Sequence, residues 1–323
     1  MVSENKKDKV VALVINFNQS QVTRECVNSL LLSSYLNLEV IIVDNGSSEH
    51  AYYLLANHFA ALDNAMVTVI RLDTNIGYVG GINKGLEAAK KYDPEHILIL
   101  NNDTEIDPSA LSNMVAVQEN HQNKAIVSGK VYNFDDRDTL QYIGQYPDPK
   151  NGLNCIAVVN GRREKDSGQY DYEIEMGMLD DIFWLFPYSL YEDIGGYSTD
   201  FFLYGEQNDF ALRAKSIGYK LIYTPSAMLW HMGSVTTAGG NSDSVRIEYW
   251  KKSAILKLAV LHLDAKSSAR FVSQWFIRET AKVLLGYVGR KKSWLHVRCH
   301  FLAYRHFTYW RTIRYSDNGY NPF

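Results

Sequence analysis

The stretch His96-Ile97-Leu98-Ile99-Leu100-Asn101-Asn102-Asp103-Thr104-Glu105 decides the fold. Its first half is a short apolar run of the kind that forms a fully buried parallel strand. The run ends abruptly, so Asn101, Asn102 and Asp103 are expected at the carboxyl end of that strand. Open α/β sheets bind ligands at this edge, and a carboxylate on a rigid strand suits a divalent cation with oxygen ligands. A capped turn before a helix opened by Asp107-Pro108 explains the same residues, so the stretch alone leaves both interpretations open.

The same pattern of strand, polar tip and helix precedes this stretch. Three earlier apolar runs end in polar tips, residues 10–17 at Asn16 and Asn18, residues 39–43 at Asp44, and residues 66–72 close to Asn75. Alternating β and α elements predict an α/β protein with a mostly parallel sheet and helices on both faces. The polar tips of the strands then meet at one edge of the sheet.

A glycine-rich segment, Asn75-Ile76-Gly77-Tyr78-Val79-Gly80-Gly81-Ile82-Asn83-Lys84-Gly85, follows the third strand and leads into a helix. Glycines let backbone amides approach a ligand closely, and the start of a helix favours an anion such as a phosphate. The spacing is neither that of a dinucleotide fingerprint nor that of a P-loop. Tight turns are therefore an alternative explanation for these glycines.

The second half of the chain carries acids and one histidine at element ends. Asp180-Asp181 opens an apolar run, where the two acids can line a cleft or face water. Glu206 and Asp209 stand at a helix start, so one can cap the helix while the other is free for proton transfer. His231 follows a strand over 220–224 and a loop, as a metal ligand would.

The composition, 46% hydrophobic and 21% charged over 323 residues, is that of a globular protein with room for one large domain and an extension. The scattered cysteines, Cys26, Cys155 and Cys299, lack metal-type spacing and favour a reducing compartment. Met1–Lys9 is not a secretory signal, and no apolar run of about 18 residues could span a bilayer. A cytoplasmic protein is expected.

Charge is divided unevenly along the chain. Residues 246–323 carry fifteen Lys and Arg against four acids, although the whole chain has a net charge of −3. These bases alternate with leucine-rich and aromatic faces, as in helices that lie on an anionic membrane surface. The same faces could instead pack on the rest of the chain or on another subunit. No nucleic-acid-binding motif accompanies them, so no nucleic-acid partner is expected.

Together these motifs resemble the inverting family 2 glycosyltransferases with the GT-A fold, and in particular their bacterial rhamnosyltransferase-like branch. The matching segments are VINFN at Asn16, IIVDNGS at Asp44, NIGYVGGINKG from Asn75, LILNNDTEIDP at Asp103, GGYSTDFFLYGEQNDFALRAKSIGY at Glu206 and TPSAMLWHMGS at His231. The resemblance implies a GT-A domain over residues 1–240, with a nucleotide-sugar half to about 124 and an acceptor half over 125–240. A basic, aromatic-rich helical region then follows at 241–323.

The resemblance also implies roles for single residues. Those assigned to the nucleotide sugar are Asn18, Asp44 and Asn75 at the base and ribose, and Gly77, Gly80, Gly81 and Asn83 near the diphosphate. Asn101-Asn102-Asp103 stands at the place of the metal-binding DXD motif. Asn101 and Asn102 are assigned to the nucleotide sugar, Asp103 is the retained metal ligand, and His231 is a further one. A bound Mn2+ or Mg2+ would stabilise the diphosphate as it leaves.

One departure from the family concerns the base. The family usually has Glu-Asp where this chain has Glu206-Gln207, and glutamine cannot accept the proton of an acceptor hydroxyl. We expect Glu206 first, or Asp209, to supply the base. Gln207, Asp181 and Trp184 are then expected to contact the acceptor.

The sequence therefore predicts a metal-dependent inverting glycosyltransferase that uses a nucleotide-diphosphate sugar. Its acceptor is expected to be a saccharide or a lipid-linked saccharide in bacterial surface polysaccharide synthesis, such as O-antigen or capsule. Hexosyl transfer, with rhamnosyl transfer as one candidate, and a position at the inner face of the cell membrane are part of this hypothesis. The alternative functions are a catalytically weak sugar-nucleotide-binding or scaffold protein and a nucleotidyltransferase. A second copy of the chain is a candidate partner, as in a homo-oligomer.

Overall fold

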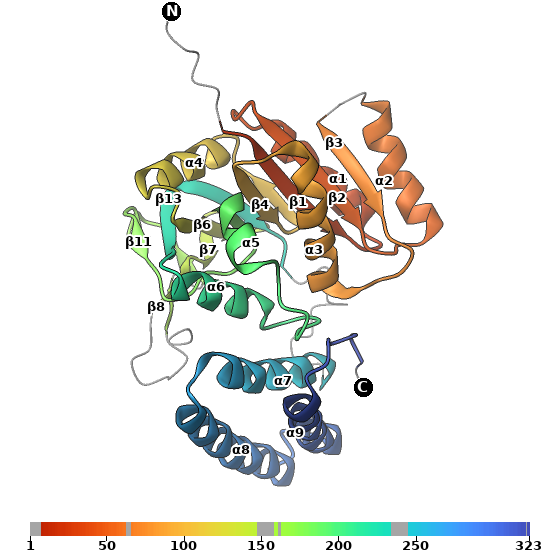
Figure 1. The fold of residues 1–323 in the computed structure, drawn as a ribbon, viewed down its shortest axis with the longest axis vertical. Coiled ribbons are helices and arrows are strands. Elements are labelled where there is room, and N and C mark those ends of the chain that lie inside the picture. Colours follow the sequence, from red (N-terminus) through yellow and green to blue (C-terminus); the bar gives the residue numbers. More distant parts are fainter. Residues whose placement is uncertain (1–7, 63–65, 147–157, 161–162, 234–244, 321) are drawn as a thin grey trace, which may run out of the picture.

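The computed structural model describes residues 8–62, 66–146, 158–160, 163–233, 245–320 and 322–323, with the backbone alone for 158–160. Most of its strands belong to an 11-stranded sheet whose main path runs β10-β7-β6-β12-β4-β1-β2-β3. Helices cover both faces of this sheet, and the last three helices lie together at one end of the molecule (Figure 1). The predicted α/β fold with a mostly parallel sheet and a helical C-terminal extension is confirmed.

The elements of the first half alternate as the sequence predicts. They are β1 (Val10–Asn16), α1 (Ser20–Leu31), β2 (Leu38–Asp44), α2 (Glu49–Ala61), β3 (Val67–Arg71), α3 (Gly77–Ala89), the short 3-10 helix η1 (Lys90–Tyr92), β4 (His96–Leu100), β5 (Thr104–Ile106) and α4 (Ala110–Asn120). β1 pairs in parallel with both β2 and β4, and β2 pairs in parallel with β3. The carboxyl ends of these strands therefore share one edge.

The second half adds strands of both directions to the same sheet. Its elements are β6 (Ala125–Asn133), β7 (Thr139–Tyr142), β8 (Gly144–Tyr146), β9 (Val158–Asn160), β10 (Glu164–Lys165), β11 (Ile174–Glu175), β12 (Phe183–Pro187), α5 (Tyr188–Ile194), α6 (Glu206–Ser216), β13 (Lys220–His231), α7 (Val245–His262), α8 (Ala265–Val288) and α9 (Trp294–Ile313). β12 lies antiparallel to β4, with Phe183 opposite Leu100. The residues that enter β12 are thereby brought to the carboxyl end of β4.

Three local predictions need correction. The glycine-rich segment is not a loop before a helix, because α3 already begins at Gly77. The helix after Pro108 begins at Ala110 rather than at the proline. The strand that begins at Lys220 does not stop at Thr224 but continues to His231, with a shift of register between Thr224 and Met228. This irregular stretch accommodates Pro225, which has no N–H to donate to a ladder.

Two apolar layers hold the helices on the sheet. Alternate residues of the central strands face opposite sides, so Val11 and Leu13 belong to one layer while Val10 and Ala12 belong to the other. Residues of α3, α5, α6 and α7 join the first layer, and residues of α1, α2 and α4 join the second. Helix α7 is thus part of the main core.

The C-terminal helices are fastened to the loop before α6. Lys257 of α7 donates to the Asp200 carbonyl oxygen at 2.5 Å and to Asp317 at 2.9 Å. The Trp310 indole of α9 donates to Asp200 Oδ1 at 2.7 Å.

Within the described ranges, none of the helices is long and apolar enough to cross a membrane.

Gly129 of β6 tests the contact with β13, because a Cβ there would lie 2.1 Å from the Ala227 carbonyl oxygen. Gly129→Ala should lower the free energy of unfolding by about 1–3 kcal/mol through overpacking. Gly286→Ala in α8 is the control, since a Cβ there would approach the flexible Lys292 side chain no closer than 3.2 Å. Alanine in a helix interior gains about 1 kcal/mol over glycine, so this variant should not be destabilised. Urea unfolding measures both, and equal midpoints would contradict the close approach.

Candidate active site

Buried polar residues build the nucleotide side of the carboxyl edge. Asn16, at the end of β1, donates to Asp44 Oδ2 at 2.7 Å and accepts from the Thr23 hydroxyl at 2.8 Å. Asp44 Oδ1 accepts from the backbone N–H of Ser47 at 3.1 Å. Both oxygens of this carboxylate are therefore engaged, and the residue is fully buried. Asp44 shapes the loop after β2, and its contact with a nucleotide stays a prediction.

Asparagine side chains join the loops that follow the first three strands. Asn18, which has φ of 56°, accepts from the Ser48 N–H at 2.9 Å. Asn45 accepts from Ile76 N–H at 3.0 Å, and Asn75 accepts from Gly77 N–H at 2.8 Å. Asn18 and Asn75 thus lie at the edge where the sequence predicts them, and they order the loops on which a nucleotide would rest.

The glycines of α3 allow close packing. A Cβ on Gly81 would lie 3.2 Å from the Ile15 side chain, and a Cβ on Gly80 would lie 2.7 Å from that of Ile76. Gly77 has φ of +80° and lies against the Phe202 ring, so a side chain there would be strained and obstructed. Packing accounts for these glycines, and the contact with a diphosphate stays a prediction.

Asn83 does not present a free amide toward the sheet edge. Its Nδ2 donates to the Tyr197 carbonyl oxygen at 2.9 Å, and its Oδ1 accepts from the Tyr197 N–H at 2.8 Å. This pair of hydrogen bonds ties α3 to the loop before α6. Asn83 therefore positions that loop, and a direct contact with the donor remains untested.

The predicted metal ligands lie side by side. β13 runs antiparallel to β5 with His231 opposite Thr104, which brings His231 Nε2 to 3.1 Å from Asp103 Oδ1. The other ring nitrogen, Nδ1, lies 2.5 Å from Gln141 Oε1. An Nδ1–H donated to Gln141 leaves the Nε2 lone pair directed at the carboxylate, an arrangement that a cation between the two atoms would satisfy.

Asn101 and Asn102 connect this pair to the nucleotide side. The Asn102 side chain is buried and donates to the Thr23 hydroxyl at 3.0 Å. The backbone carbonyl oxygen of Asn101 accepts from the Thr104 hydroxyl at 2.7 Å. Neither side chain is shown next to Asp103 as a further cation ligand, and no cluster of three or more His, Cys, Asp or Glu suited to a metal occurs among the described residues.

Asp181 is buried in a tyrosine cage. Its Oδ2 accepts from the Tyr197 hydroxyl at 2.8 Å and from the Tyr78 hydroxyl at 3.2 Å. Burial, with the neighbouring Asp180 charge second, raises the pKa of Asp181 to about 7. Of the two interpretations of the Asp180-Asp181 pair, the solvent-facing one is wrong for Asp181, because the chain turns inward at the entry to β12.

Glu206 is the second buried carboxyl group of this cluster. It is 2% exposed, and its Oε2 has no hydrogen-bond partner. Burial, followed by the charge of Asp181, raises its pKa to about 8. Gln207 donates to Asp180 Oδ1 at 2.8 Å. The amide that stands in place of the family's usual aspartate is therefore hydrogen-bonded to Asp180.

Each carboxylate oxygen of Asp209 has a partner within the protein. Its Oδ2 accepts from Arg213 Nε at 2.8 Å, and its Oδ1 lies 2.8 Å from His262 Nε2 of α7. Arg213 also donates to the carbonyl oxygens of Ile194 and Gly196. Asp209 therefore connects α6 with α7 and with the loop after α5, and it has no oxygen left for a substrate proton.

Trp184 lies within the core of β12. It is fully buried, its Nε1 has no partner, and its ring packs 6.3 Å from that of Phe210 between centroids. The ring is closed to an acceptor in this conformation. Its predicted acceptor contact stays untested.

Several site residues were not singled out from the sequence. Tyr78 and Tyr197 stand inside quoted motifs, but nothing in the chain pairs them with Asp181, more than 100 residues from Tyr78. Gln141 lies in a segment without any site signal. Contacts between such distant residues depend on tertiary structure.

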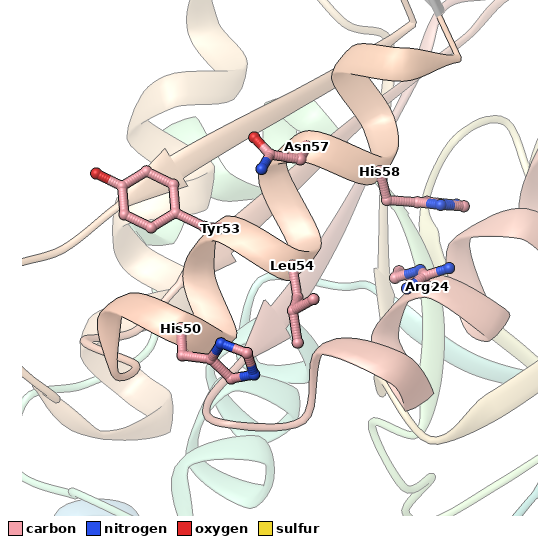
Figure 2. Close-up of a pocket in the computed structure, with 6 residues that line it drawn as sticks. All are labelled: Arg24, His50, Tyr53, Leu54, Asn57 and His58. Atoms are coloured by element: carbon pink, nitrogen blue, oxygen red, sulfur yellow. The ribbon is translucent and has the colours of Figure 1, made fainter.

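A separate groove of about 490 Å³ lies on the outer face of α1 and α2 (Figure 2). It is lined by Arg24, His50, Tyr53, Leu54, Asn57 and His58. None of the predicted site residues lines it. The candidate active site is therefore the carboxyl edge of the sheet.

Comparison with known proteins identifies the family. The chain matches the family model described as Glycosyl transferase family 2 over residues 11–195. It is 25% identical over 292 residues to the galactofuranosyltransferase GlfT2 of Mycolicibacterium smegmatis. This alignment covers 81% of this chain and 42% of GlfT2. The chain is 23% identical over 257 residues to a poly-beta-1,6-N-acetyl-D-glucosamine synthase of Staphylococcus aureus (strain COL). This alignment covers 76% of this chain and 55% of the synthase. The chain spans about half the length of the curated relatives it matches.

Two solved structures share the fold. The mannosyltransferase PcManGT from Pyrobaculum calidifontis, in complex with GDP-Man and Mn2+, aligns with a TM-score of 0.56 and 14% identity over 95% of this chain and 88% of that one. GalNAc-T7 with UDP, GalNAc and Mn2+ aligns with a TM-score of 0.57 and 13% identity, over 87% of this chain and 58% of that one. The fold is that of a GT-A glycosyltransferase. The family model covers more than half of the sequence, and the chain belongs to glycosyltransferase family 2.

The raised pKa of Glu206 predicts how stability depends on pH. The folded protein holds a proton up to about pH 8 that the unfolded chain releases near 4.5. Stability should therefore fall as pH rises between these values and then level off. Glu206→Gln removes the titration, so its unfolding free energy should vary less with pH and should exceed the wild-type value most at the alkaline end.

Urea unfolding across this pH range, without divalent cation, measures the effect. The control is Glu87→Gln, because Glu87 is an exposed helical residue. That variant should keep the wild-type slope. Parallel slopes for wild type and Glu206→Gln would show that Glu206 ionises normally.

Proposed function

We propose that the protein transfers a hexose, with rhamnose as one candidate, from a nucleotide-diphosphate sugar to a hydroxyl of a saccharide, with inversion at the anomeric carbon. The main support is the convergence of two units at one edge of the sheet, the Asp103–His231 pair and the buried Glu206. Hydrogen bonds link the two units through the segment that enters β12. Gln207, next to Glu206, donates to Asp180 Oδ1 at 2.8 Å, and the Asn101 N–H, two residues before Asp103, donates to the Ile182 carbonyl oxygen at 2.9 Å.

In the proposed reaction, which requires Glu206 in its ionised form, the acceptor hydroxyl gives its proton to the Glu206 carboxylate while its oxygen forms a bond to the anomeric carbon. The bond from that carbon to the diphosphate oxygen breaks, and its electron pair leaves with the diphosphate. Glu206 suits this role because Oε2 is unpartnered and because a raised pKa approaches the working pH, where a general base is most effective. Asp209 suits it less, since Arg213 and His262 occupy its oxygens.

The Asp103–His231 pair fits a divalent cation, Mn2+ or Mg2+. One acidic oxygen and one imidazole nitrogen face each other, and Gln141 orients the ring from its far side. Such a cation would stabilise negative charge on the departing diphosphate. The imidazole ligand favours Mn2+ over Mg2+, and both structural neighbours contain Mn2+.

The acceptor is proposed to be a saccharide or lipid-linked saccharide in bacterial surface polysaccharide synthesis, of the O-antigen or capsule type. Support comes from the poly-N-acetylglucosamine synthase relatives and from the basic C-terminal region. The protein would then work at the inner face of the cell membrane as a peripheral protein.

A first test concerns the cation. Asp103→Ala should nearly abolish transfer, and Gln141→Ala should weaken Mn2+ binding by about 10–100-fold, as losses behind a ligating histidine do. Gln21→Ala is the control, because Gln21 is exposed and its side chain donates to Glu25 on the same helix. Calorimetric Mn2+ titration and transfer assays give the two readouts. Full activity of Asp103→Ala in excess chelator would contradict the assignment.

A second test concerns the base and the stereochemistry. Glu206→Gln should lower kcat by about 10²–10⁴-fold while donor binding changes little. Asp209→Asn should instead lower the melting temperature, because it leaves Arg213 and His262 without their carboxylate. Glu192→Gln, at an exposed position of α5, controls for the loss of one charge.

Turnover also distinguishes an enzyme from a scaffold protein. A screen of nucleotide sugars should give hydrolysis or transfer, and NMR of the product should show the inverted anomer. Donor binding without turnover would favour the scaffold alternative. A retained anomer, or normal turnover by Glu206→Gln, would exclude direct displacement with Glu206 as base.

A further inference from the structure

We propose that the turn between α8 and α9 docks the protein on an anionic lipid bilayer. The surface, called the elbow below, consists of Leu284, Leu285, Tyr287, Val288, Arg290, Lys291, Trp294 and Leu295. The inference deepens the proposed function, since it names the part of the chain that would bring the active site to a lipid-linked acceptor. Its physical basis is independent of catalysis.

The apolar residues of the elbow are unusually exposed. Leu285 is 73% exposed, Val288 is 79% exposed and Trp294 is 62% exposed. Leu284, Tyr287 and Leu295 lie between 43% and 49%. Large side chains gathered on one exposed turn are a mark of an interaction site, and tryptophan and tyrosine suit the boundary between lipid and water.

Packing of the helices on each other does not require these side chains. The contact between α8, α9 and α7 uses a different set of buried residues, namely Val272, Trp275, Val283, Val297, Cys299, Ala303, Phe307 and Trp310. Val283 and Leu285 are neighbours in sequence but face opposite ways, at 1% and 73% exposure. The inner faces are therefore already filled, and the outer apolar residues form a second face.

The charge around the elbow selects the occupant. Residues 280–300, on both sides of the turn, contain five Lys and Arg and no acid. Of these bases, Lys292 pairs with Glu248 of α7, and Lys282 pairs with Glu279. Arg290 and Lys291, on the turn itself, pair with no carboxylate in the part of the chain that the structure describes. An anionic bilayer complements this charge, whereas a second elbow of the same sign would repel it.

The turn is held in shape rather than loose. The N–H groups of Lys291 and Lys292 donate to the Gly286 carbonyl oxygen at 2.8 and 3.0 Å, and the Arg290 N–H donates to that of Tyr287 at 3.0 Å. The Tyr287 and Trp294 rings meet edge to face with centroids 6.0 Å apart. The bases and apolar side chains are thus presented together, as an interfacial helix pair requires.

The experiment uses the full-length protein and vesicles of phosphatidylcholine, with or without phosphatidylglycerol. The wild type should sediment with the anionic vesicles at low salt, much less with the neutral ones, and less as salt rises. The double variant Leu285→Glu/Val288→Glu should bind at least about tenfold more weakly, since charge at the interface opposes insertion. Arg290→Ala/Lys291→Ala should lose about tenfold or more, because each base contributes roughly 1 kcal/mol.

Matched controls carry the same changes elsewhere. Leu32→Glu/Leu36→Glu alters two apolar residues that are 72% and 81% exposed on the catalytic domain, and it should bind like the wild type. Lys84→Ala/Lys90→Ala removes two bases from the same domain and should also bind like the wild type. No binding by the wild type, or equal losses in elbow and control variants, would overturn the proposal. So would a dimer that the elbow variants dissociate, which would assign the surface to a second copy.

Transfer to a water-soluble acceptor is measured for the same variants. The elbow variants should keep it, because none of their residues lies in the active site. Lost vesicle binding with normal transfer separates this inference from the proposed function. Normal vesicle binding by a protein that transfers no sugar would overturn the proposed function alone.

Discussion

The candidate active site depends on a strand that runs against its neighbours. β12 pairs antiparallel to β4, whereas β1 to β4 pair with one another in parallel, and Phe183 lies opposite Leu100. The residues that lead into β12 therefore start where β4 ends, and the Asn101 N–H donates to the Ile182 carbonyl oxygen at 2.9 Å. This reversal places Asp180 and Asp181 next to the segment that carries Asp103. A parallel strand would have placed its leading residues at the opposite edge of the sheet.

The buried acids constrain the rest of the molecule, because a carboxyl group taken out of water must gain partners or keep its proton. Asp181 gains two tyrosine hydroxyls, and Asp209 gains Arg213 and His262. Burial raises the pKa of Glu206 to about 8, so this carboxyl group is protonated below that pH and ionised above it. The partners come from α3, α6, α7 and the loop between α5 and α6. Helix α7 therefore packs with the candidate site, although the sequence predicts a separate C-terminal region that begins with it.

The sequence-based predictions succeed where the signal is local. The apolar runs and their polar tips predict β1 to β4, and α6 begins at Glu206 with Glu206 and Asp209 in its first turn, as predicted. They fail where backbone chemistry and tertiary packing compete, as at Pro225, which interrupts the pattern of a strand that nevertheless continues to His231. They also misplace the glycines of α3, since a glycine needed for helix–sheet contact and one needed for a ligand look alike in sequence.

The sequence by itself determined the alternation of strands and helices, the polar carboxyl edge and the basic character of the C-terminal region, because these follow from periodicity and composition along short stretches. Only the tertiary structure decided which polar residues have free atoms. It gave Glu206 an unpartnered oxygen, engaged both oxygens of Asp209, and set His231 beside Asp103 with Gln141 behind it. The physical reason is that hydrogen-bond partners and burial come from residues far apart in the chain, and both together set the chemistry of a carboxyl group or an imidazole.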